Sequence, residues 1–174
     1  MLALNLQTIK SGRERFERVY PADVVYSRND DFKIVAPVEL GFDIYKDKDQ
    51  YRLVGKVATS LELNCSRCLE PFVAATETAF DLRYQRHTPV TNPVEREVEE
   101  DDLTTAFYEN EEIDLGQLMH EQFYLALPMK PLCEEACKGL CSTCGTNLNR
   151  GGCQCHPRWN DPRLAVLEAL KKES

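Results

Sequence analysis

Eight cysteines provide most of the chemistry that this chain could carry out. They form four close pairs, namely Cys65 and Cys68, Cys133 and Cys137, Cys141 and Cys144, and Cys153 and Cys155. A tetrahedral four-thiolate zinc site needs two such pairs from separate loops, because both sulfurs of a close pair reach one ion without straining the backbone. The spacing therefore predicts structural metal sites rather than isolated buried thiols.

The last two pairs form the clearer set. Gly145 directly follows Cys144, at the point where a zinc knuckle needs a left-handed residue so that backbone N–H groups point at sulfur. Side chains two residues apart in an extended chain point to the same side, and Gly151 and Gly152 let the chain fold back. We predict one structural zinc ion on Cys141, Cys144, Cys153 and Cys155.

The remaining cysteines come from distant parts of the chain, and two interpretations stay open for them. Cys65, Cys68, Cys133 and Cys137 either share a second zinc ion, which would hold the C-terminal segment against the sheet, or are left as buried thiols. A redox role for Cys65 and Cys68 is disfavoured, because a thioredoxin-type pair precedes a helix whereas Pro71 and a β-rich run follow here. His156 could replace a thiolate, but we expect a solvated loop histidine.

Alternating apolar and polar residues predict the strands that carry these cysteines. Residues 32–45, with a break at Pro37, and residues 51–65 read as a hairpin around the polar turn 46–50, and residues 72–84 read as a third strand. Residues 1–22 read as a short strand followed by a basic connector. Asp114 is a good N-cap for a helix that Pro128 ends, and Asp161 and Pro162 open a last helix.

These elements predict an α+β fold: an antiparallel β-rich body with one or two helices and a C-terminal four-Cys zinc-knuckle segment. We expect three parts. Residues 1–94 form the antiparallel β body, residues 95–113 an acidic linker, and residues 114–174 the helix, the cysteine-rich zinc segment and the terminal helix.

The charge of the chain is uneven and argues against a dedicated nucleic-acid binder. The formal net charge is −8, and residues 95–121 hold one arginine against 11 acidic residues. Nucleic-acid binders usually carry the opposite sign, because their affinity comes from neutralising phosphates. The acidic run could imitate phosphate and bind a basic protein, or could be a solvated linker. Its candidate partner-binding residues are Glu97, Glu99, Glu100, Asp101 and Asp102.

Direct RNA contact remains possible only through a local basic patch around the zinc segment. The candidate residues are Lys130, Lys138, Arg150, Arg158 and Arg163. Trp159 could stack on a base, although packing against the terminal helix is the simpler expectation.

No apolar run reaches the roughly 18–20 residues that a membrane span needs, and the first residues do not resemble a secretory signal. We therefore expect a cytoplasmic protein with reduced thiols, no membrane contact and no small-molecule substrate.

Four segments, in this order, resemble the bacterial YceD family (DUF177) of large ribosomal RNA subunit accumulation proteins. They are LELNCSRCLEPF, EIDLGQLMHEQFYLALPMKPLC, CKGLCSTCGTNLN and RLAVLEALK, and the resemblance covers about residues 30–172. It implies a cytoplasmic, non-enzymatic factor needed for accumulation of 23S rRNA, and it transfers no catalytic residue.

We therefore expect a factor for large ribosomal subunit biogenesis that binds a basic ribosomal protein of the large subunit, the 23S rRNA precursor, or both, and holds one or two structural Zn²⁺ ions. The alternative is a thiol–disulfide oxidoreductase or a zinc-dependent redox-sensing protein. A closed four-thiolate site lacks the open coordination position of catalytic zinc, which disfavours a metal hydrolase.

Overall fold

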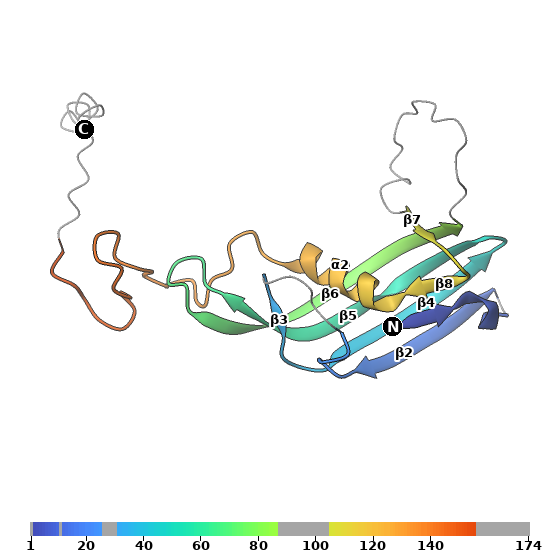
Figure 1. Ribbon diagram of the computed structural model, residues 1–174, viewed down its shortest axis with the longest axis horizontal. Coiled ribbons are helices and arrows are strands. Elements are labelled where there is room, and N and C mark those ends of the chain that lie inside the picture. Colours follow the sequence, from blue (N-terminus) through green and yellow to red (C-terminus); the bar gives the residue numbers. More distant parts are fainter. Residues whose placement is uncertain (1, 11, 26–30, 87–104, 156–174) are drawn as a thin grey trace, which may run out of the picture.

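A long sheet with one helix against it forms the body of the protein. The computed structural model describes residues 2–10, 12–25, 31–86 and 105–155. The cysteine-rich segment extends from one tip of the sheet, far from the opposite tip where β4 turns into β5 (Figure 1). Among the described residues, the elements confirm a strand-rich α+β fold with one α-helix.

The main sheet has the strand order β2-β4-β5-β6-β7, and the short strand β3 also pairs with β5. Its strands are β2 (Arg13–Tyr20), β3 (Lys33–Ile34), β4 (Val38–Asp47), β5 (Gln50–Asn64), β6 (Pro71–Arg86) and β7 (Thr105–Tyr108). A second, two-stranded sheet pairs β1 (Ala3–Asn5) with β8 (Glu112–Asp114), and a single 3-10 turn, η1 (Leu6–Thr8), follows β1. The β4–β5 and β5–β6 hairpins are antiparallel as predicted, whereas β7 runs parallel to β6, which makes the sheet mixed.

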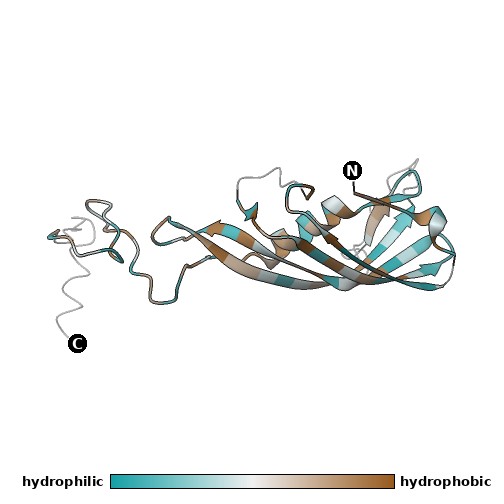
Figure 2. Cartoon of the chain, turned by 90° about the horizontal axis from the view of Figure 1, so that it is seen from below, coloured by the Kyte–Doolittle hydropathy of each residue, from teal (hydrophilic) through white to brown (hydrophobic). Residues whose placement is uncertain are grey.

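The core lies between one face of this sheet and helix α2 (Leu115–Ala126), which Figure 2 shows on one side of the strands. Side chains alternate between the two faces of a strand, so every second residue of β5 points to the helix. Leu53, Val57 and Leu61 are fully buried there, and the helix contributes Leu118 and Phe123. The β5–β6 hairpin is paired along its whole length, from Gln50 opposite Gln85 to Asn64 opposite Pro71, and its turn carries Cys65 and Cys68.

Residues 13–20 form a strand, so the expectation of a basic connector there was wrong. β2 pairs with β4, and the Phe16 ring stacks on the Phe42 ring with centroids 4.8 Å apart. Arg13 lies on the outer face of this edge strand and pairs with Asp43 at 3.0 Å. The alternation of charged residues with Phe16 is a strand pattern in which the charges stay solvated, as is common on edge strands.

Residues 105–114, most of which the sequence places in an acidic linker, contain the strands β7 and β8. Tyr108 is buried at the end of β7, where its ring meets Tyr51 edge-on at 5.6 Å and its hydroxyl donates to the Asp49 carbonyl at 3.1 Å. Burial of a large aromatic side chain is favourable, and a solvated loop would not provide it. The segment that contains Tyr108 therefore joins the sheet despite the charged residues around it. Glu97, Glu99, Glu100, Asp101 and Asp102 lie outside the described residues.

Helix α2 begins and ends where its capping residues predict. Asp114 Oδ1 accepts from the backbone N–H groups of Gly116 at 2.8 Å and Gln117 at 3.1 Å, which confirms the N-cap. The helix stops at Ala126, before Pro128. The predicted terminal helix lies outside the described residues. Within the described part of the chain, no helix is both long and apolar enough to cross a membrane.

Candidate metal centres

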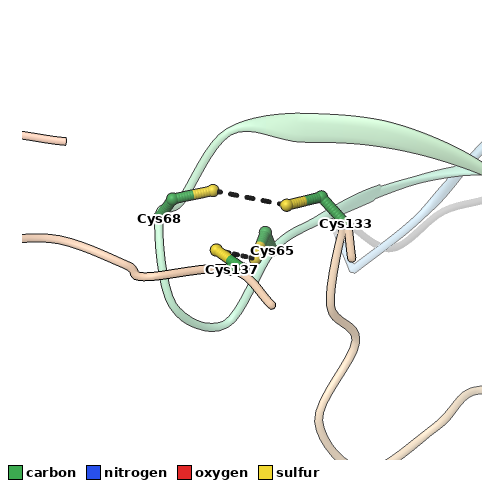
Figure 3. Close-up of side chains that lie close together, drawn as sticks. All are labelled: Cys65, Cys68, Cys133 and Cys137. Carbon is green, nitrogen blue, oxygen red and sulfur yellow. Dashed lines mark hydrogen bonds between the residues drawn. The ribbon is translucent and has the colours of Figure 1, made fainter. Parts of the chain in front are cut away.

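The first cysteine cluster, called the sheet-tip cluster, joins the β5–β6 turn to the segment that follows α2. Cys65 and Cys68 lie in the turn, and Cys133 and Cys137 return to it from the C-terminal side (Figure 3). The sulfurs of Cys65 and Cys137 are 3.7 Å apart and those of Cys68 and Cys133 are 3.8 Å apart. Four sulfurs at about 2.3 Å from one zinc ion stand about 3.8 Å from each other in a tetrahedron, whereas a disulfide needs about 2 Å.

The second cluster, called the C-terminal cluster, consists of Cys141, Cys144, Cys153 and Cys155. Its four sulfurs lie within 4.8 Å of one another, as do those of the sheet-tip cluster. Gly145 has a φ of +73°, and its N–H donates to the Cys141 carbonyl at 2.9 Å. The Thr143 N–H donates to Cys141 Sγ at 3.4 Å. The turn thus presents backbone N–H groups to sulfur in the way a metal-bound thiolate requires.

The structure therefore brings together the same two sets of four cysteines that the sequence groups by spacing. Either set can hold a metal ion. All donors are sulfur, which suits a soft or borderline cation such as zinc, and four donors complete a tetrahedron. The donor set fits a structural ion. Four protein ligands leave no open coordination position at which water or a substrate could bind for catalysis.

Cys65–Leu69 forms the same five-residue turn as Cys141–Gly145. Leu69 has a φ of +60°, and its N–H donates to the Cys65 carbonyl at 2.9 Å. From the sequence, a left-handed position is predicted only at Gly145. The shared C-x-x-C spacing could have indicated the second one, but leucine gives no sign of a left-handed backbone.

Arg67 joins the two halves of the sheet-tip cluster, a role that sequence reasoning missed. Its guanidinium donates to the carbonyl of Glu135 at 3.1 Å and to the carbonyl of Cys137 at 2.9 Å. Its own carbonyl accepts from the Leu140 N–H at 3.1 Å, and Gly139 lies so close that a Cβ there would stand 3.0 Å from that oxygen. These bonds hold the Cys133–Cys137 segment against the β5–β6 turn.

The environment separates the thiol pKa values within each cluster. In the sheet-tip cluster, the Cys68 N–H lowers the pKa of Cys65 to about 6, whereas desolvation and the neighbouring thiols raise that of Cys133 to about 12. In the C-terminal cluster, the Thr146 hydroxyl lowers the pKa of Cys144 to about 6, and Cys144 raises that of Cys155 to about 12. A cation shared by the four sulfurs of a cluster would neutralise the negative charge that their thiolates bring together.

The residues predicted to contact RNA differ in whether the structure gives them a partner within the protein. Lys130 and Lys138 are exposed, whereas the Arg150 guanidinium pairs with Glu70 at 2.6 Å. Arg158, Arg163, Trp159 and His156 lie outside the described residues.

The redox interpretation of Cys65 and Cys68 gains no support from the geometry. Strand β6, not a helix, follows Cys68, and both residues are buried. A thiol that attacks a disulfide needs access and usually a helix N-terminus to stabilise its thiolate.

Residues 53–171 match the family described as "Large ribosomal RNA subunit accumulation protein YceD". The chain is similar to "Large ribosomal RNA subunit accumulation protein YCED homolog 1, chloroplastic" from Zea mays, with 30% identity over 167 residues that cover 78% of this chain and 54% of the relative. The protein of the same name from Arabidopsis thaliana is 27% identical over 165 residues, which cover 82% of this chain and 51% of the relative.

An uncharacterized protein of Mycobacterium tuberculosis (strain ATCC 25618 / H37Rv) is 32% identical over 123 residues, which cover 70% of this chain and 56% of that protein. The chain thus spans about half the length of the curated relatives that it matches. No solved structure matches it.

Proposed function

This chain belongs to the YceD family of large ribosomal RNA subunit accumulation proteins, and from that premise we propose that it is a non-enzymatic factor that supports 23S rRNA accumulation and large ribosomal subunit biogenesis in the cytoplasm. The family match over residues 53–171 is the observation that carries the proposal, because it spans both cysteine clusters and helix α2. The two four-cysteine clusters agree with a non-enzymatic role, because closed four-thiolate sites are typical of structural and not of catalytic zinc.

Each cluster holds one structural Zn²⁺ ion in this proposal. The support is the all-sulfur donor set, the separations near a tetrahedral edge, and the N–H groups that point at sulfur. The ligands are Cys65, Cys68, Cys133 and Cys137 in one site and Cys141, Cys144, Cys153 and Cys155 in the other. The ions order a segment that has few apolar residues to bury, because metal binding supplies free energy of folding.

The partner that the charge favours is a basic ribosomal protein of the large subunit. The formal charge is −8, and each four-thiolate zinc site adds further negative charge. A hollow of about 320 Å³ lies between β7, β8 and α2, and the acidic residues Glu109, Glu112, Asp114 and Glu121 are among those that line it. Direct contact with the 23S rRNA precursor through Lys130, Lys138 and the other predicted basic residues is the second candidate, supported by the exposure of those two lysines.

Depletion of the protein in the organism that makes it tests the function. We expect a fall in 23S rRNA relative to 16S rRNA, restored by the unaltered chain. An unchanged ratio on full depletion would refute the proposal.

A pull-down with charge-neutralised variants tests the partner. In one variant Glu97, Glu99, Glu100, Asp101 and Asp102 become Gln or Asn, and in the matched control the same is done at Glu17, Glu39, Asp47, Glu62 and Glu77. We expect the first variant alone to lose basic ribosomal proteins. Equal recovery by both variants would show that the acidic run is only solvated.

Oxidation of the purified, zinc-loaded chain tests whether the cysteines have a structural role or act in a thiol–disulfide oxidoreductase or redox sensor. Stoichiometric zinc that survives mild oxidation supports the structural role. A Cys65–Cys68 couple that titrates reversibly would favour redox chemistry.

A further inference from the structure

The two cysteine clusters are joined by the side chain of Asn149, which lies in the loop between Cys144 and Cys153. Its Nδ2 donates to Sγ of Cys137 at 3.2 Å. This hydrogen bond links the loop of the C-terminal cluster to a cysteine of the sheet-tip cluster. Its Oδ1 accepts from the Lys138 N–H at 2.7 Å. Because a backbone N–H can only donate, it requires the amide oxygen on its side, and the NH₂ group is thereby directed at the sulfur.

The rest of the loop is held in a way that keeps this amide in place. The Leu148 N–H donates to the Gly139 carbonyl at 2.9 Å, and Leu140 forms an antiparallel bridge with Asn147. The Asn149 N–H donates to Asn147 Oδ1 at 2.9 Å. Arg150 then pairs with Glu70, directly after the β5–β6 turn. The loop of the C-terminal cluster is therefore held to residues 138–140, which directly follow Cys137 of the sheet-tip cluster.

A hydrogen bond to a metal-bound thiolate spreads the negative charge of the sulfur and slows its protonation and exchange. Groups of this kind, one step removed from the metal, typically change metal affinity by about 10–100-fold when removed. The loop that carries Asn149 lies between Cys144 and Cys153, two members of the C-terminal cluster, so an ion that closes this cluster adds a restraint to the loop.

We propose that Asn149 is a positioning residue that couples the two metal sites: an ion in the C-terminal cluster fixes the loop that places the Asn149 amide on Cys137, and so slows metal loss from the sheet-tip cluster. This rests on the proposed occupation of both clusters by zinc. Because coupling free energies are reciprocal, an ion in the sheet-tip cluster also stabilises binding at the C-terminal cluster.

Zinc release from the full chain to a chromophoric chelator tests the coupling, with the two sites distinguished by ¹¹³Cd NMR of the cadmium-loaded chain. Asn149→Asp keeps an acceptor for the Lys138 N–H but replaces the donor to Cys137 with an oxygen. We expect release from the sheet-tip cluster to become about 10–100-fold faster, with release from the C-terminal cluster much less affected. Gln154→Glu is the matched control, since it makes the same amide-to-carboxylate change at an exposed residue of the same segment.

A double-mutant cycle shows whether the two clusters communicate through this residue. Cys153→Ser with Cys155→Ser abolishes the C-terminal site, and we expect it to speed release from the sheet-tip cluster as much as Asn149→Asp does. Adding Asn149→Asp to that variant is then expected to change nothing further. Independent, multiplicative effects would overturn the coupling, as would equal release rates for Asn149→Asp and Gln154→Glu.

The zinc content of the purified chain distinguishes failure of the coupling from failure of the proposed metal sites. A chain that binds two zinc ions but shows no effect of Asn149→Asp refutes the coupling alone. A chain that binds no zinc at either cluster refutes the proposed metal sites, and the coupling with them.

Discussion

Leu69 and Gly145 occupy the same left-handed position, each directly after the second cysteine of a C-x-x-C turn. Their φ angles are +60° and +73°, and each donates its N–H to the carbonyl of the first cysteine at 2.9 Å. A left-handed backbone costs about 1–2 kcal/mol for a residue with a Cβ and little for glycine. The sheet-tip turn therefore carries a conformational cost that the C-terminal turn avoids.

Exchanging these two residue types should have opposite effects on metal binding. Gly145→Ala should weaken zinc binding at the C-terminal cluster by about 1 kcal/mol, or roughly fivefold, through backbone strain alone, because a Cβ there meets no atom within 4 Å. Leu69→Gly should leave zinc binding at the sheet-tip cluster as tight or up to about fivefold tighter, since Leu69 is 64% exposed and little burial is lost. Competition titrations with a chelator measure both, and equal weakening by the two changes would contradict the shared geometry.

Removing two ligands of the C-terminal cluster should loosen the segment that follows Cys137 and leave the sheet folded. Cys141→Ser with Cys144→Ser should abolish zinc binding at the C-terminal cluster and raise amide hydrogen exchange within residues 138–155, because closure of this cluster by a metal ion restrains that segment. Strands β4 and β5 should keep their protection, since their core is apolar. Ser142→Ala, an exposed change between the same two cysteines, is the control. Equal loss of protection throughout would contradict the expectation that the β body keeps its fold without the C-terminal metal site.

Two glycines of the sheet should respond differently to alanine. A Cβ at Gly55 would lie 2.4 Å from the Cβ of Phe42 and 2.2 Å from the Gly41 carbonyl oxygen, so Gly55→Ala should lower the free energy of unfolding by about 3 kcal/mol or prevent folding. At Gly41, the nearest atom to a new Cβ is 3.6 Å away, an ordinary contact. Gly41→Ala should therefore change stability by less than about 1 kcal/mol. Urea unfolding of the zinc-loaded variants measures both free energies. Similar unfolding midpoints would show that the space between Gly55 and Phe42 can accept a methyl group.

Tyr84 should make the fold less stable in alkali. Burial, and then the charges of Glu121 and Asp114, raise the pKa of its hydroxyl well above the usual value of about 10. Above pH 10 the unfolded chain therefore loses this proton while the folded chain keeps it. The unfolded state binds fewer protons there, so the free energy of unfolding falls as pH rises, by up to about 1.4 kcal/mol per pH unit for one group.

Denaturant unfolding of the unaltered chain and of Tyr84→Phe between pH 9 and 11.5 measures this contribution. The variant should show a shallower decline, because phenylalanine releases no proton. Parallel declines in the two proteins would assign the alkaline loss of stability to other groups.

The sequence by itself determined the local features of this protein. Alternation with period two predicted the hairpins of β4, β5 and β6, because a strand with one buried face must alternate. Asp114 and Pro128 predicted the bounds of α2, and the C-x-x-C-G run predicted the left-handed turn at Gly145. Each depends on neighbours within a few residues, where the choice of side chain decides the backbone conformation. The cysteine spacings also grouped the sulfurs as the structure does, while the binding of zinc remains a prediction.

Only the tertiary structure decided the relationships between distant segments. It showed that Cys133 and Cys137 return to the β5–β6 turn, that residues 13–20 form a strand, and that β7 joins the sheet in parallel. It also placed Arg67 on the carbonyl of Cys137 and the Asn149 amide on its sulfur. Such contacts depend on strand register and on which chain ends meet at the tip of the sheet. A single arginine or asparagine carries no local mark of them, because its conformational preferences are the same whether or not its partner lies nearby.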